Sequence, residues 1–336
     1  MPDINRKPVV SFIFRKRDPT YFSMEKVFSS VIEALRSDIE VDIRTADYPS
    51  SSIRNLIANM RSAGKSSAAI YHVTGDIHYT VLGLPSRKAV LTIHDCVFLE
   101  RTSGMKRRLF KKLWLTWPVR RAAVVTTISE KSKKEIIAHT GADPEKIVVI
   151  PNPIGGHIYY REKPFDREHP VILFIGSTPN KNLDRVIESL QGIPCTLEII
   201  GKISDIQQRR MDELGITWRT LQQLSEEALA DRYAGCDLVL FPSTYEGFGL
   251  PITEAQKAGR PVITSDLSPM KEVAGNAACL VDPYSTDSIR SGVLKVIRDD
   301  NYRCELVKKG FGNVRRYDRS IIAEQYLAVY RKLLKQ

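Results

Sequence analysis

The sequence predicts an α/β protein made of two Rossmann-like, doubly wound domains that face a cleft, and three observations carry this prediction. Short apolar runs alternate with stretches of helical period, which is the pattern of parallel strands joined by helices. The pattern stops once, at the polar and proline-containing segment 159–170, and then begins again. The length of 336 residues suits two domains of ordinary size.

The first half of the chain supplies one set of strands and helices. Its expected strands are short apolar or alternating runs at residues 8–14, 39–45, 68–73, 89–95, 122–129 and 146–154. Helices are expected at 23–35 and 130–140, and the second has Ser129 in position to cap its start and Gly141 to end it.

The second half repeats the alternation. Its expected strands are residues 171–176, 196–201, 237–243, 260–266 and 277–283. Its expected helices are residues 182–192, 225–236, 286–300 and 318–336. The last helix carries an apolar stripe at helical spacing, formed by Ile322, Tyr326, Val329 and Leu333.

These elements set the expected domain boundaries. The N-terminal domain covers residues 1–157, a linker covers 158–169, and the second domain covers 170–317. Ligands of open α/β sheets bind beyond the carboxyl ends of the strands, so the loops that follow strands are where functional residues are expected.

Composition narrows the class of protein. The apolar fraction of 43% and the charged fraction of 26% are ordinary for a globular enzyme. No apolar run reaches the roughly 18 residues that span a bilayer, and the N-terminus shows no signal-peptide pattern, so we expect a cytoplasmic protein. Five scattered cysteines without a C-x-x-C pair argue against a disulfide framework and a zinc site. The net charge of +11 favours anionic partners without choosing among nucleic acid, anionic lipid and phosphorylated ligands.

The stretch YEGFGLPITEA, residues 245–255, carries the most specific signal. Gly247 and Gly249 allow positive φ and a close approach of backbone to a ligand. Pro251 suits the start of a helix, whose free N–H groups and partial positive charge bind anions such as phosphate. Glu246 before the loop and Glu254 on the first turn can accept hydrogen bonds from sugar and ribose hydroxyls. Taken alone, each acid also fits a structural role, either at the helix dipole or in solvent.

The spacing E-x7-E in this stretch resembles retaining glycosyltransferases of family 4, which have a GT-B fold. The segments FIGSTPNKNLDRVIESL, YAGCDLVLFPSTYEGFGLPITEA and LVDPYSTDSI stand in the order of that family. In the N-terminal half, LTIHD and VVTTISEKSKKEI also resemble it. The resemblance implies that the helix at 318–336 crosses back onto the N-terminal domain.

The resemblance implies a role for each matching residue. Glu246 would contact donor-sugar hydroxyls, Glu254 the ribose, and Lys181 the diphosphate, where a fixed cation stabilises the departing group. His94 would lie near the reacting sugar; a hydrogen-bonded structural histidine is the alternative. The implied catalytic residues are His94, Lys181 and Glu246. The implied donor-binding residues are Gly176, Ser177, Lys181, Lys202, Glu246, Gly247, Phe248, Gly249, Leu250 and Glu254.

One departure from the family concerns the second cation beside the diphosphate. Many relatives carry an arginine directly after the glycine or just before the lysine, where this chain has Ser177 and Asn180. Lys202 is the candidate replacement. Taken alone, Lys181 is equally compatible with a solvated lysine at a helix start.

The sequence contains no D-x-D, the acidic pair with which metal-dependent transferases hold a cation against the diphosphate. We therefore expect a metal-independent reaction without a cofactor, in which the helix end and Lys181 replace the cation. His72 and His78 lack a convincing set of further metal ligands. The resemblance gives no firmly established enzyme nucleophile.

Residues 101–121 contain eight basic residues and no acid. Phe110, Leu113, Trp114 and Trp117 follow helical spacing, so the segment predicts a basic amphipathic helix that lies on an anionic membrane. The alternative is that these apolar side chains are core and the basic face is solvated.

The leading hypothesis is a retaining glycosyltransferase that moves mannose or another hexose from a GDP- or UDP-linked donor to a glycan or lipid-linked acceptor. Such an enzyme of cell-surface polysaccharide or glycolipid synthesis would act in the cytoplasm, at the inner face of the cell membrane. Arg15, Lys16 and Arg17 are candidates to meet an anionic acceptor, or are solvated. The alternatives are a nucleotide-sugar epimerase or phosphorylase of the same architecture, and a basic nucleic-acid-binding protein, for which the chain has no recognition motif.

Overall fold

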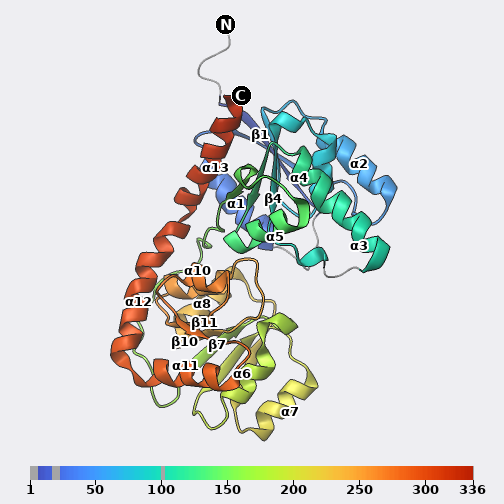
Figure 1. Cartoon of the computed structure of the whole chain (residues 1–336). Coiled ribbons are helices and arrows are strands. Elements are labelled where there is room, and N and C mark those ends of the chain that lie inside the picture. Colours follow the sequence, from blue (N-terminus) through green and yellow to red (C-terminus); the bar gives the residue numbers. More distant parts are fainter. Residues whose placement is uncertain (1–6, 17–22, 100–102, 336) are drawn as a thin grey trace. The chain divides into compact units, whose positions relative to one another are not determined.

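The computed structural model describes residues 7–16, 23–99 and 103–335, and the chain divides into two compact units (Figure 1). Unit 1 takes in the chain up to Pro153 together with the C-terminal segment from Arg319, and unit 2 runs from Ile154 to Asp318. Arg17, and residues 101 and 102 of the basic segment, lie outside the described residues.

Unit 1 is built on a parallel sheet which, over the described residues, has six strands in the order β2-β1-β3-β4-β5-β6. The strands are β1 (Val9–Phe14), β2 (Glu40–Thr45), β3 (Ile70–Val73), β4 (Ala89–Ile93), β5 (Val124–Thr127) and β6 (Ile147–Val149). The longer helices are α1 (Ser23–Leu35), α2 (Ile53–Ala63), α3 (Gly104–Lys111), α4 (Trp117–Arg121), α5 (Glu130–Thr140) and α13 (Arg319–Leu334). Short helical turns are η1 (His78–Gly83), η2 (Ser86–Lys88), η3 (Val97–Leu99), the π-helical η4 (Lys112–Thr116) and η5 (Pro144–Lys146).

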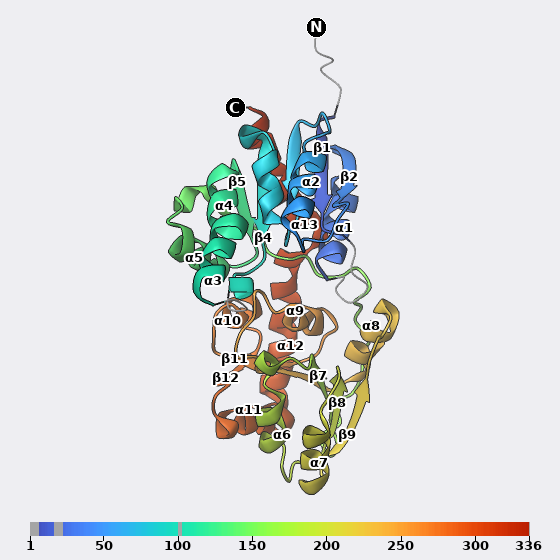
Figure 2. The same cartoon turned by 90° about the vertical axis from the view of Figure 1, so that its right-hand side faces the viewer.

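Helices cover both faces of this sheet. In Figure 1, α1 and α13 lie against one face, while α2, α3 and α4 lie on the other. Figure 2 looks onto the side of α2 and α3, and α13 lies behind the sheet. Successive residues of β1 point to opposite faces, so Phe12 packs with α1 and α13 while Ile13 packs with the core on the other side. A strand buried on both faces reads as a continuous apolar run, which is why β1, β3, β4 and β5 could be predicted. The strand β2 is partly exposed and was predicted from its alternating pattern.

Unit 2 has the same architecture with a different strand order. Its parallel sheet has six strands among the described residues, in the order β12-β11-β10-β7-β8-β9. The strands are β7 (Val171–Ile175), β8 (Thr196–Ile200), β9 (Thr217–Leu221), β10 (Leu238–Phe241), β11 (Val262–Ser265) and β12 (Cys279–Val281). The helices are α6 (Leu183–Ser189), α7 (Asp205–Glu213), α8 (Glu226–Gly235), α9 (Leu250–Lys257), α10 (Met270–Ala274), α11 (Thr286–Arg298) and α12 (Asp300–Val314), with short turns η6 (Pro179–Lys181) and η7 (Arg315–Tyr317).

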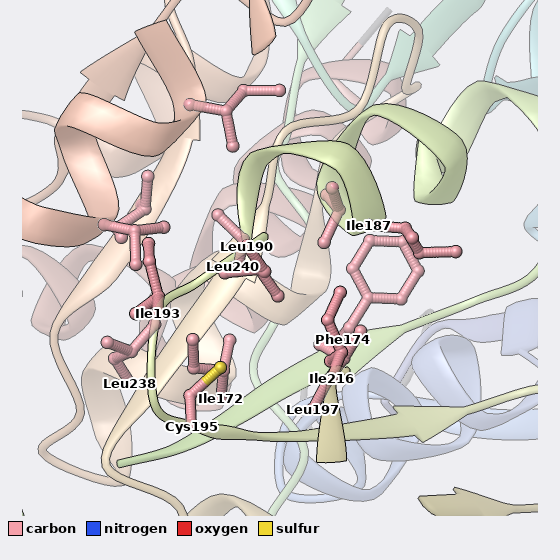
Figure 3. Packing of buried hydrophobic residues seen from close by; sticks show 14 of the residues in the cluster. Ile172, Phe174, Ile187, Leu190, Ile193, Cys195, Leu197, Ile216, Leu238 and Leu240 are labelled. Atoms are coloured by element: carbon pink, nitrogen blue, oxygen red, sulfur yellow. The ribbon is translucent and has the colours of Figure 1, made fainter. Parts of the chain in front are cut away.

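The core of unit 2 holds the strands that carry the candidate site. Figure 3 shows Phe174 of β7, Leu197 of β8 and Ile216 packed together beneath Ile187 of α6. The side chains of Phe174 and Leu197 are fully buried, as is Ile252 of α9. Burying a side chain of this size contributes roughly 1.5–3 kcal/mol, so the loops that follow these strands start from fixed positions.

The expected apolar stripe of the last helix is confirmed, since Ile322, Tyr326, Val329 and Leu333 are buried in the core of unit 1. Cys96, Cys195, Cys236 and Cys279 are buried, whereas Cys304 is exposed. Residues 158–169, expected as a linker, belong to unit 2, where Lys163 pairs with the buried Asp237. Over the described residues, no helix is both long and apolar enough to cross a membrane.

Candidate active site

The strand order of unit 2 reverses between β7 and β10, which is the switch point of its sheet. Loops that leave the carboxyl ends of two such strands diverge to opposite faces and make room for a ligand between them. The loop after β7 carries Lys181 and the loop after β10 carries Glu246. Residues that are 65 positions apart in the sequence therefore meet at this point.

Lys181 and Glu246 form the central ion pair of the site. The Lys181 Nζ lies 2.6 Å from Glu246 Oε1, and the two side chains are 19% and 13% exposed. The ammonium group also lies 4.8 Å from the centre of the Phe241 ring. This partial burial reduces solvent screening, so both charges act more strongly here than they would on an open surface.

Asn180 ties the two loops together next to this pair. Its side-chain Nδ2 donates to the carbonyl oxygen of Tyr245 at 2.8 Å, and its own carbonyl accepts from the Thr244 N–H at 2.8 Å. The same amide nitrogen lies 3.5 Å from Glu246 Oε1. The backbone before Glu246 is thus held from both sides, which fixes where its carboxylate can point.

Gly176 explains how Lys181 reaches across the loop. Its φ is +100°, and a Cβ at this position would lie 2.8 Å from Cγ and Cε of Lys181. Only glycine accepts this backbone conformation and this contact without strain. The aliphatic part of Lys181 lies directly over Gly176, and the ammonium group is carried to the loop after β10.

The helix α9 begins where the second loop ends. Gly249 precedes it with φ +104°, Leu250 is its first residue and Pro251 its second. Pro251 has no N–H, and the Ile252 N–H donates to the Gly249 carbonyl oxygen at 3.0 Å. The Leu250 N–H has no partner within the helix, and the positive end of the helix dipole attracts anions. Glu254 is the fifth residue of the helix, which places it on the second turn and corrects the expectation of the first turn.

The Glu254 carboxylate accepts a hydrogen bond from the Tyr233 hydroxyl at 2.6 Å. Burial raises the pKa of the Glu254 carboxyl, and the hydrogen bond from Tyr233 opposes that change. Burial also raises the pKa of Tyr233 well above its ordinary value, so this hydroxyl stays a neutral donor. Tyr233 comes from α8 and fixes one carboxylate oxygen of Glu254. The other oxygen is a further hydrogen-bond acceptor.

The other expected donor residues surround the same switch point with unequal exposure. Ser177 follows Gly176 and is exposed. Lys202, which follows β8, is exposed and makes no hydrogen bond or ion pair with a described residue. Its neighbour Gly201 lies close to Ser177, because a Cβ there would be 3.1 Å from Ser177 Cβ. The Phe248 ring turns inward and packs edge-on against Tyr317 at 5.5 Å, so only its backbone faces the loop.

Unit 1 also gathers charged groups at its switch point, which lies between β1 and β3. Arg15, which follows β1, pairs with Glu25 of α1 at 2.7 Å and with Asp76, which follows β3, at 2.5 Å. Asp76 has φ +42°, a conformation that short polar residues tolerate better than others. Arg15 is therefore held between two carboxylates rather than simply solvated.

His94 follows β4 and stands beside this cluster. Its Nε2 lies 3.1 Å from the Thr74 carbonyl oxygen. That nitrogen must donate, so the neutral ring keeps a lone pair on Nδ1. Burial lowers the pKa of His94, while the hydrogen bond to Thr74 and the charge of Asp76 oppose the change. The ring is neutral at pH 7 and can accept a proton.

His72 and His78 are structural histidines. His72 is fully buried, with Nδ1 2.6 Å from the Tyr330 hydroxyl and Nε2 2.7 Å from Thr92 Oγ1. His78 Nδ1 donates to the Trp114 carbonyl at 2.9 Å. Among the described residues, no group of three or more His, Cys, Asp or Glu side chains could hold a metal ion.

The basic segment forms α3, η4 and α4, and the structure divides its apolar residues into two sets. Phe110, Leu113 and Trp114 pack against the core of unit 1, and the Trp114 indole donates to the Asp76 carbonyl at 2.9 Å. Trp117 is 44% exposed. Met105 and Leu109, which were not singled out in the sequence, are 84% and 62% exposed.

Two comparisons with known families match the two halves of the chain separately. A model described as "Glycosyl transferases group 1" matches residues 159–312, and one described as "Glycosyltransferase Family 4" matches residues 34–155. Between them they account for most of the chain.

Individual proteins give the same result. O-antigen chain mannosyltransferase B of Escherichia coli is 25% identical over 282 residues, which cover 74% of this chain and 72% of that protein. O-antigen chain mannosyltransferase RfbU of Salmonella typhimurium (strain LT2) is 27% identical over 226 residues, covering 65% of this chain and 63% of RfbU, which is less than two thirds of its length. The crystal structure of Anabaena HepE in complex with UDP and glucose shares the fold, with a TM-score of 0.77 at 17% identity, over 97% of this chain and 100% of that one.

Two parallel-sheet units, each matched by a glycosyltransferase family model, define the class of this protein: it is a glycosyltransferase of the GT-B fold. The chain belongs to the family 4-like glycosyltransferases. The fold and family predicted from the sequence are confirmed.

The structure adds residues that the sequence did not single out for the site. Asn180 clamps the two loops, Tyr233 holds Glu254, and Asp76 completes the cluster around Arg15. Each acts through a contact between distant segments, and such a contact leaves no local pattern in one sequence. Gly75 and Asp76 are residue types that favour turns, and both have positive φ here, +147° and +42°.

Proposed function

We propose that this glycosyltransferase moves a hexose, with mannose the first candidate, from a GDP- or UDP-linked donor to a hydroxyl of a glycan or lipid-linked acceptor in polysaccharide or glycolipid synthesis. The relatives named as O-antigen mannosyltransferases support mannose and a polysaccharide acceptor. The observation that carries the proposal is the Lys181–Glu246 pair, set beside the head of α9 at the switch point of unit 2.

The donor diphosphate would lie between Lys181 and the first turn of α9. A diphosphate offers the Lys181 ammonium anionic oxygens that can replace those of Glu246. The Leu250 N–H and the positive end of the helix dipole at the start of α9 would bind the same phosphates. The exposed Lys202 would supply the second cation, in place of the arginine that many relatives carry. Developing charge on the leaving diphosphate would thus meet fixed positive groups.

The two glutamates would hold two different parts of the donor. Glu254, fixed by Tyr233, would accept from the ribose hydroxyls, and Glu246 would accept from hydroxyls of the sugar. When the diphosphate takes over Lys181, the Glu246 carboxylate becomes available to those hydroxyls. Both acids act as binding groups, so neither has to change protonation state during the reaction.

In the proposed reaction, the bond from the anomeric carbon to the diphosphate breaks while the acceptor oxygen bonds to that carbon on the same face. The electron pair goes to the diphosphate, and the acceptor proton passes to the departing phosphate oxygen. The configuration at the anomeric carbon is therefore retained without a covalent enzyme intermediate. His94, neutral with Nδ1 unprotonated, would orient a sugar hydroxyl from unit 1. The route uses neither a metal ion nor a cofactor.

A transfer assay tests the proposal. The full chain is incubated with GDP-mannose or UDP-glucose and a lipid-linked sugar acceptor, with and without EDTA. We expect acceptor-dependent release of nucleoside diphosphate, unchanged by EDTA, and an α-linked product by NMR. Conversion of the free nucleotide sugar to an epimer, or phosphate-dependent sugar release, would instead identify the epimerase or the phosphorylase. Nucleic-acid affinity without nucleotide-sugar binding would refute the proposal.

The roles of the two glutamates can be separated in the same assay. Glu254→Ala should weaken nucleoside diphosphate binding about tenfold, the value of one charge-assisted hydrogen-bonding group. Glu246→Ala should lower turnover and leave nucleotide affinity within about twofold, because its partners are sugar hydroxyls. Equal nucleotide affinity in Glu254→Ala and wild type, by isothermal titration, would contradict the assigned roles.

We further propose that α3 and the turn after it dock on an anionic membrane. The exposed Met105, Leu109 and Trp117 supply the apolar contact, and the exposed Lys106 and Arg107 attract anionic headgroups. This arrangement would bring the enzyme to the inner face of the cell membrane, where a lipid-linked acceptor would lie.

Co-sedimentation with vesicles of 7:3 phosphatidylcholine and phosphatidylglycerol, a ratio of about one anionic lipid in three, tests the docking. Wild type should bind, whereas Leu109→Ser combined with Met105→Ser should bind several-fold less. Ile206→Ser, a matched change at another exposed apolar residue, should bind like wild type. Equal loss in both variants, or binding to neutral vesicles alone, would contradict this role of α3.

A further inference from the structure

A cavity of unit 2 lies at the amino ends of the strands, whereas the candidate active site lies at their carboxyl ends. It has a volume of about 490 Å³ and is bordered by Asp237 and Pro261, which immediately precede β10 and β11 at their amino ends. The donor loops follow the carboxyl ends of β7 and β10, so the length of the sheet separates the two places. The volume is within the range of about 300–1,000 Å³ typical of small-molecule sites.

The charge around this cavity is unbalanced. Its lining contains four basic side chains, namely Lys163, Arg260, Arg303 and Lys308, and one acid, Asp237. Asp237 is buried and already paired with Lys163, and it also accepts from the N–H groups of Asp166 and Val171. Arg303 pairs with Asp300, which does not line the cavity. Little negative charge is therefore left for Arg260 and Lys308.

Arg260 is the group that most needs a counter-ion. It is 5% exposed and donates through Nη2 to the carbonyl oxygens of Arg161 and Ala234, and its Nε has no hydrogen-bond partner. No carboxylate of a described residue lies within ion-pair distance of it. A buried cation without a partner is costly, so an anion in the cavity would be stabilised by this guanidinium.

The rest of the wall is aromatic. Tyr160 and Phe311 meet edge to face with their centres 5.3 Å apart, and both lie against Gly259, where a Cβ would be 2.6 Å from Tyr160 Cδ2 and 3.0 Å from Phe311 Cζ. The two rings are 55% and 36% exposed. On the far side the Arg303 guanidinium stacks over Phe165 at 3.9 Å. Exposed rings beside buried cations are suited to a flat molecule that carries a negative charge.

We propose that this cavity binds a small aromatic anion, with its phosphate or similar group towards Arg260 and Lys308 and its ring against Tyr160 and Phe311. The site is distinct from the donor site and does not depend on the identity of the donor. The two sites are joined by α9, because its first turn borders the donor loops and Gly259 and Arg260 follow its C-cap residue Ala258.

Cys304 makes the site directly observable. It lines the cavity and is exposed, whereas the other four cysteines are buried. Labelling of Cys304 in the full chain by N-ethylmaleimide, followed by mass spectrometry, therefore reports on occupancy. With 1-naphthyl phosphate as the probe, we expect the labelling rate to fall at least about fivefold at saturation, since an occupied cavity covers the thiol. Inorganic phosphate or 1-naphthol alone should change it by less than about twofold.

Two lysines that are adjacent in α12 give the matched control. Lys308 lines the cavity, while Lys309 pairs with Glu305 outside it. Lys308→Gln should weaken protection by 1-naphthyl phosphate about fivefold, and Lys309→Gln should match wild type. Tyr160→Ala, at an exposed position, tests the ring contact without touching the buried Arg260. Saturating GDP or UDP should not displace the probe. Absence of protection, equal effects of both lysine changes, or competition by the nucleotides would overturn the proposal.

Discussion

The two units of the chain each place charged side chains at the switch point of a parallel sheet, but they do so with opposite balances of charge. In unit 2, one lysine meets one glutamate, beside the positive end of α9. In unit 1, Arg15 meets two acids, Glu25 and Asp76. The first arrangement suits an anion such as a diphosphate, and the second suits groups that donate hydrogen bonds, such as hydroxyls.

The two clusters also differ in how firmly the surrounding residues hold their charged side chains in place. Glu246 is positioned by Asn180, which holds the backbone on both sides of Tyr245, and by the buried strands that precede each loop. Asp76 lies in a turn and its side chain is 52% exposed. A donor with fixed chemistry suits the first kind of support, whereas an acceptor that differs among relatives suits the second. The following predictions test this division, beginning with the largest effect.

Removing the cation of unit 2 should have the largest consequence. Lys181→Ala should lower transfer about 10²–10³-fold, the usual loss when one preorganised group that stabilises a leaving charge is removed. Lys309→Ala is the matched control, because Lys309 also lies 2.7 Å from a glutamate of the same unit, but in an exposed pair. Steady-state rates with a saturating donor measure both. A loss below tenfold in Lys181→Ala would remove this lysine from the reaction.

The second-largest effect should come from filling the close contact between Gly176 and Lys181. Gly176→Ala places a Cβ against the Lys181 stem at a backbone φ of +100°, so we expect transfer to fall about tenfold or more. Gly192, with φ +69° and open space around it, provides the comparison. Gly192→Ala should cost only about 1 kcal/mol of stability and leave transfer unchanged. Equal kinetic effects of the two changes would show that backbone strain, rather than the position of Lys181, was responsible.

A change in the charged cluster of unit 1 should affect the use of the acceptor and not the binding of the donor nucleotide. Asp76→Asn keeps a residue that tolerates positive φ but removes the charge facing Arg15. We expect kcat/KM for the acceptor to fall about three- to tenfold, while nucleotide affinity stays within about twofold of wild type. Asp38→Asn breaks an exposed pair with Arg331 in the same unit and should leave both kcat/KM and nucleotide affinity unchanged. A change in nucleotide affinity would refute the division between the units.

Lowering the pH should reduce the free energy of unfolding of unit 1 more than that of unit 2. Burial lowers the pKa of His72 to about 3, and it lowers those of His78 and His94 as well. Between pH 6.5 and 3 the unfolded chain binds more protons than the folded one at His72, and His78 and His94 shift in the same direction. Unit 1 therefore loses stability as the pH falls below 6.5 and not above it. Each such histidine lowers the free energy of unfolding by up to about 1.4 kcal/mol for each pH unit of acidification.

Urea unfolding at pH 7.5 and 5.5, followed by tryptophan fluorescence, measures this slope. His72→Gln should reduce the slope by up to one proton, and His169→Gln, at an exposed ring of unit 2, should leave it unchanged. The same slope in His72→Gln and wild type would contradict the buried neutral state of His72.

The sequence predicted most of the strands because the central strands of both parallel sheets are buried on both faces, which gives strands such as β7 and β10 continuous apolar runs. It also predicted the core of the donor site, since glycines, a proline and two acids stand close together in residues 245–255. β9 was not predicted. Two of its residues, Thr217 and Arg219, are exposed, so it lacks a fully buried run.

The parts of the site that could not be predicted depend on contacts between distant segments. Tyr233 and Glu254 are 21 positions apart, and Arg15 and Asp76 are 61 apart. The apolar residues of the basic segment show the same limit. Their helical spacing was correct. Which side of the helix packs on the core depends on Tyr79, a distant residue of unit 1 whose ring contacts Trp114 at a tilt, with centres 4.9 Å apart.

Hydrogen exchange in the presence of a nucleoside diphosphate tests the central claim most directly. With saturating GDP or UDP, we predict slower exchange in peptides covering residues 176–181 and 244–254, the loops and helix start that surround Lys181 and Glu246. Peptides covering residues 74–76 and 94–95 of unit 1 should exchange at the rate of the free protein. Protection in unit 1 without protection at the unit 2 loops would contradict the assignment of the donor to unit 2.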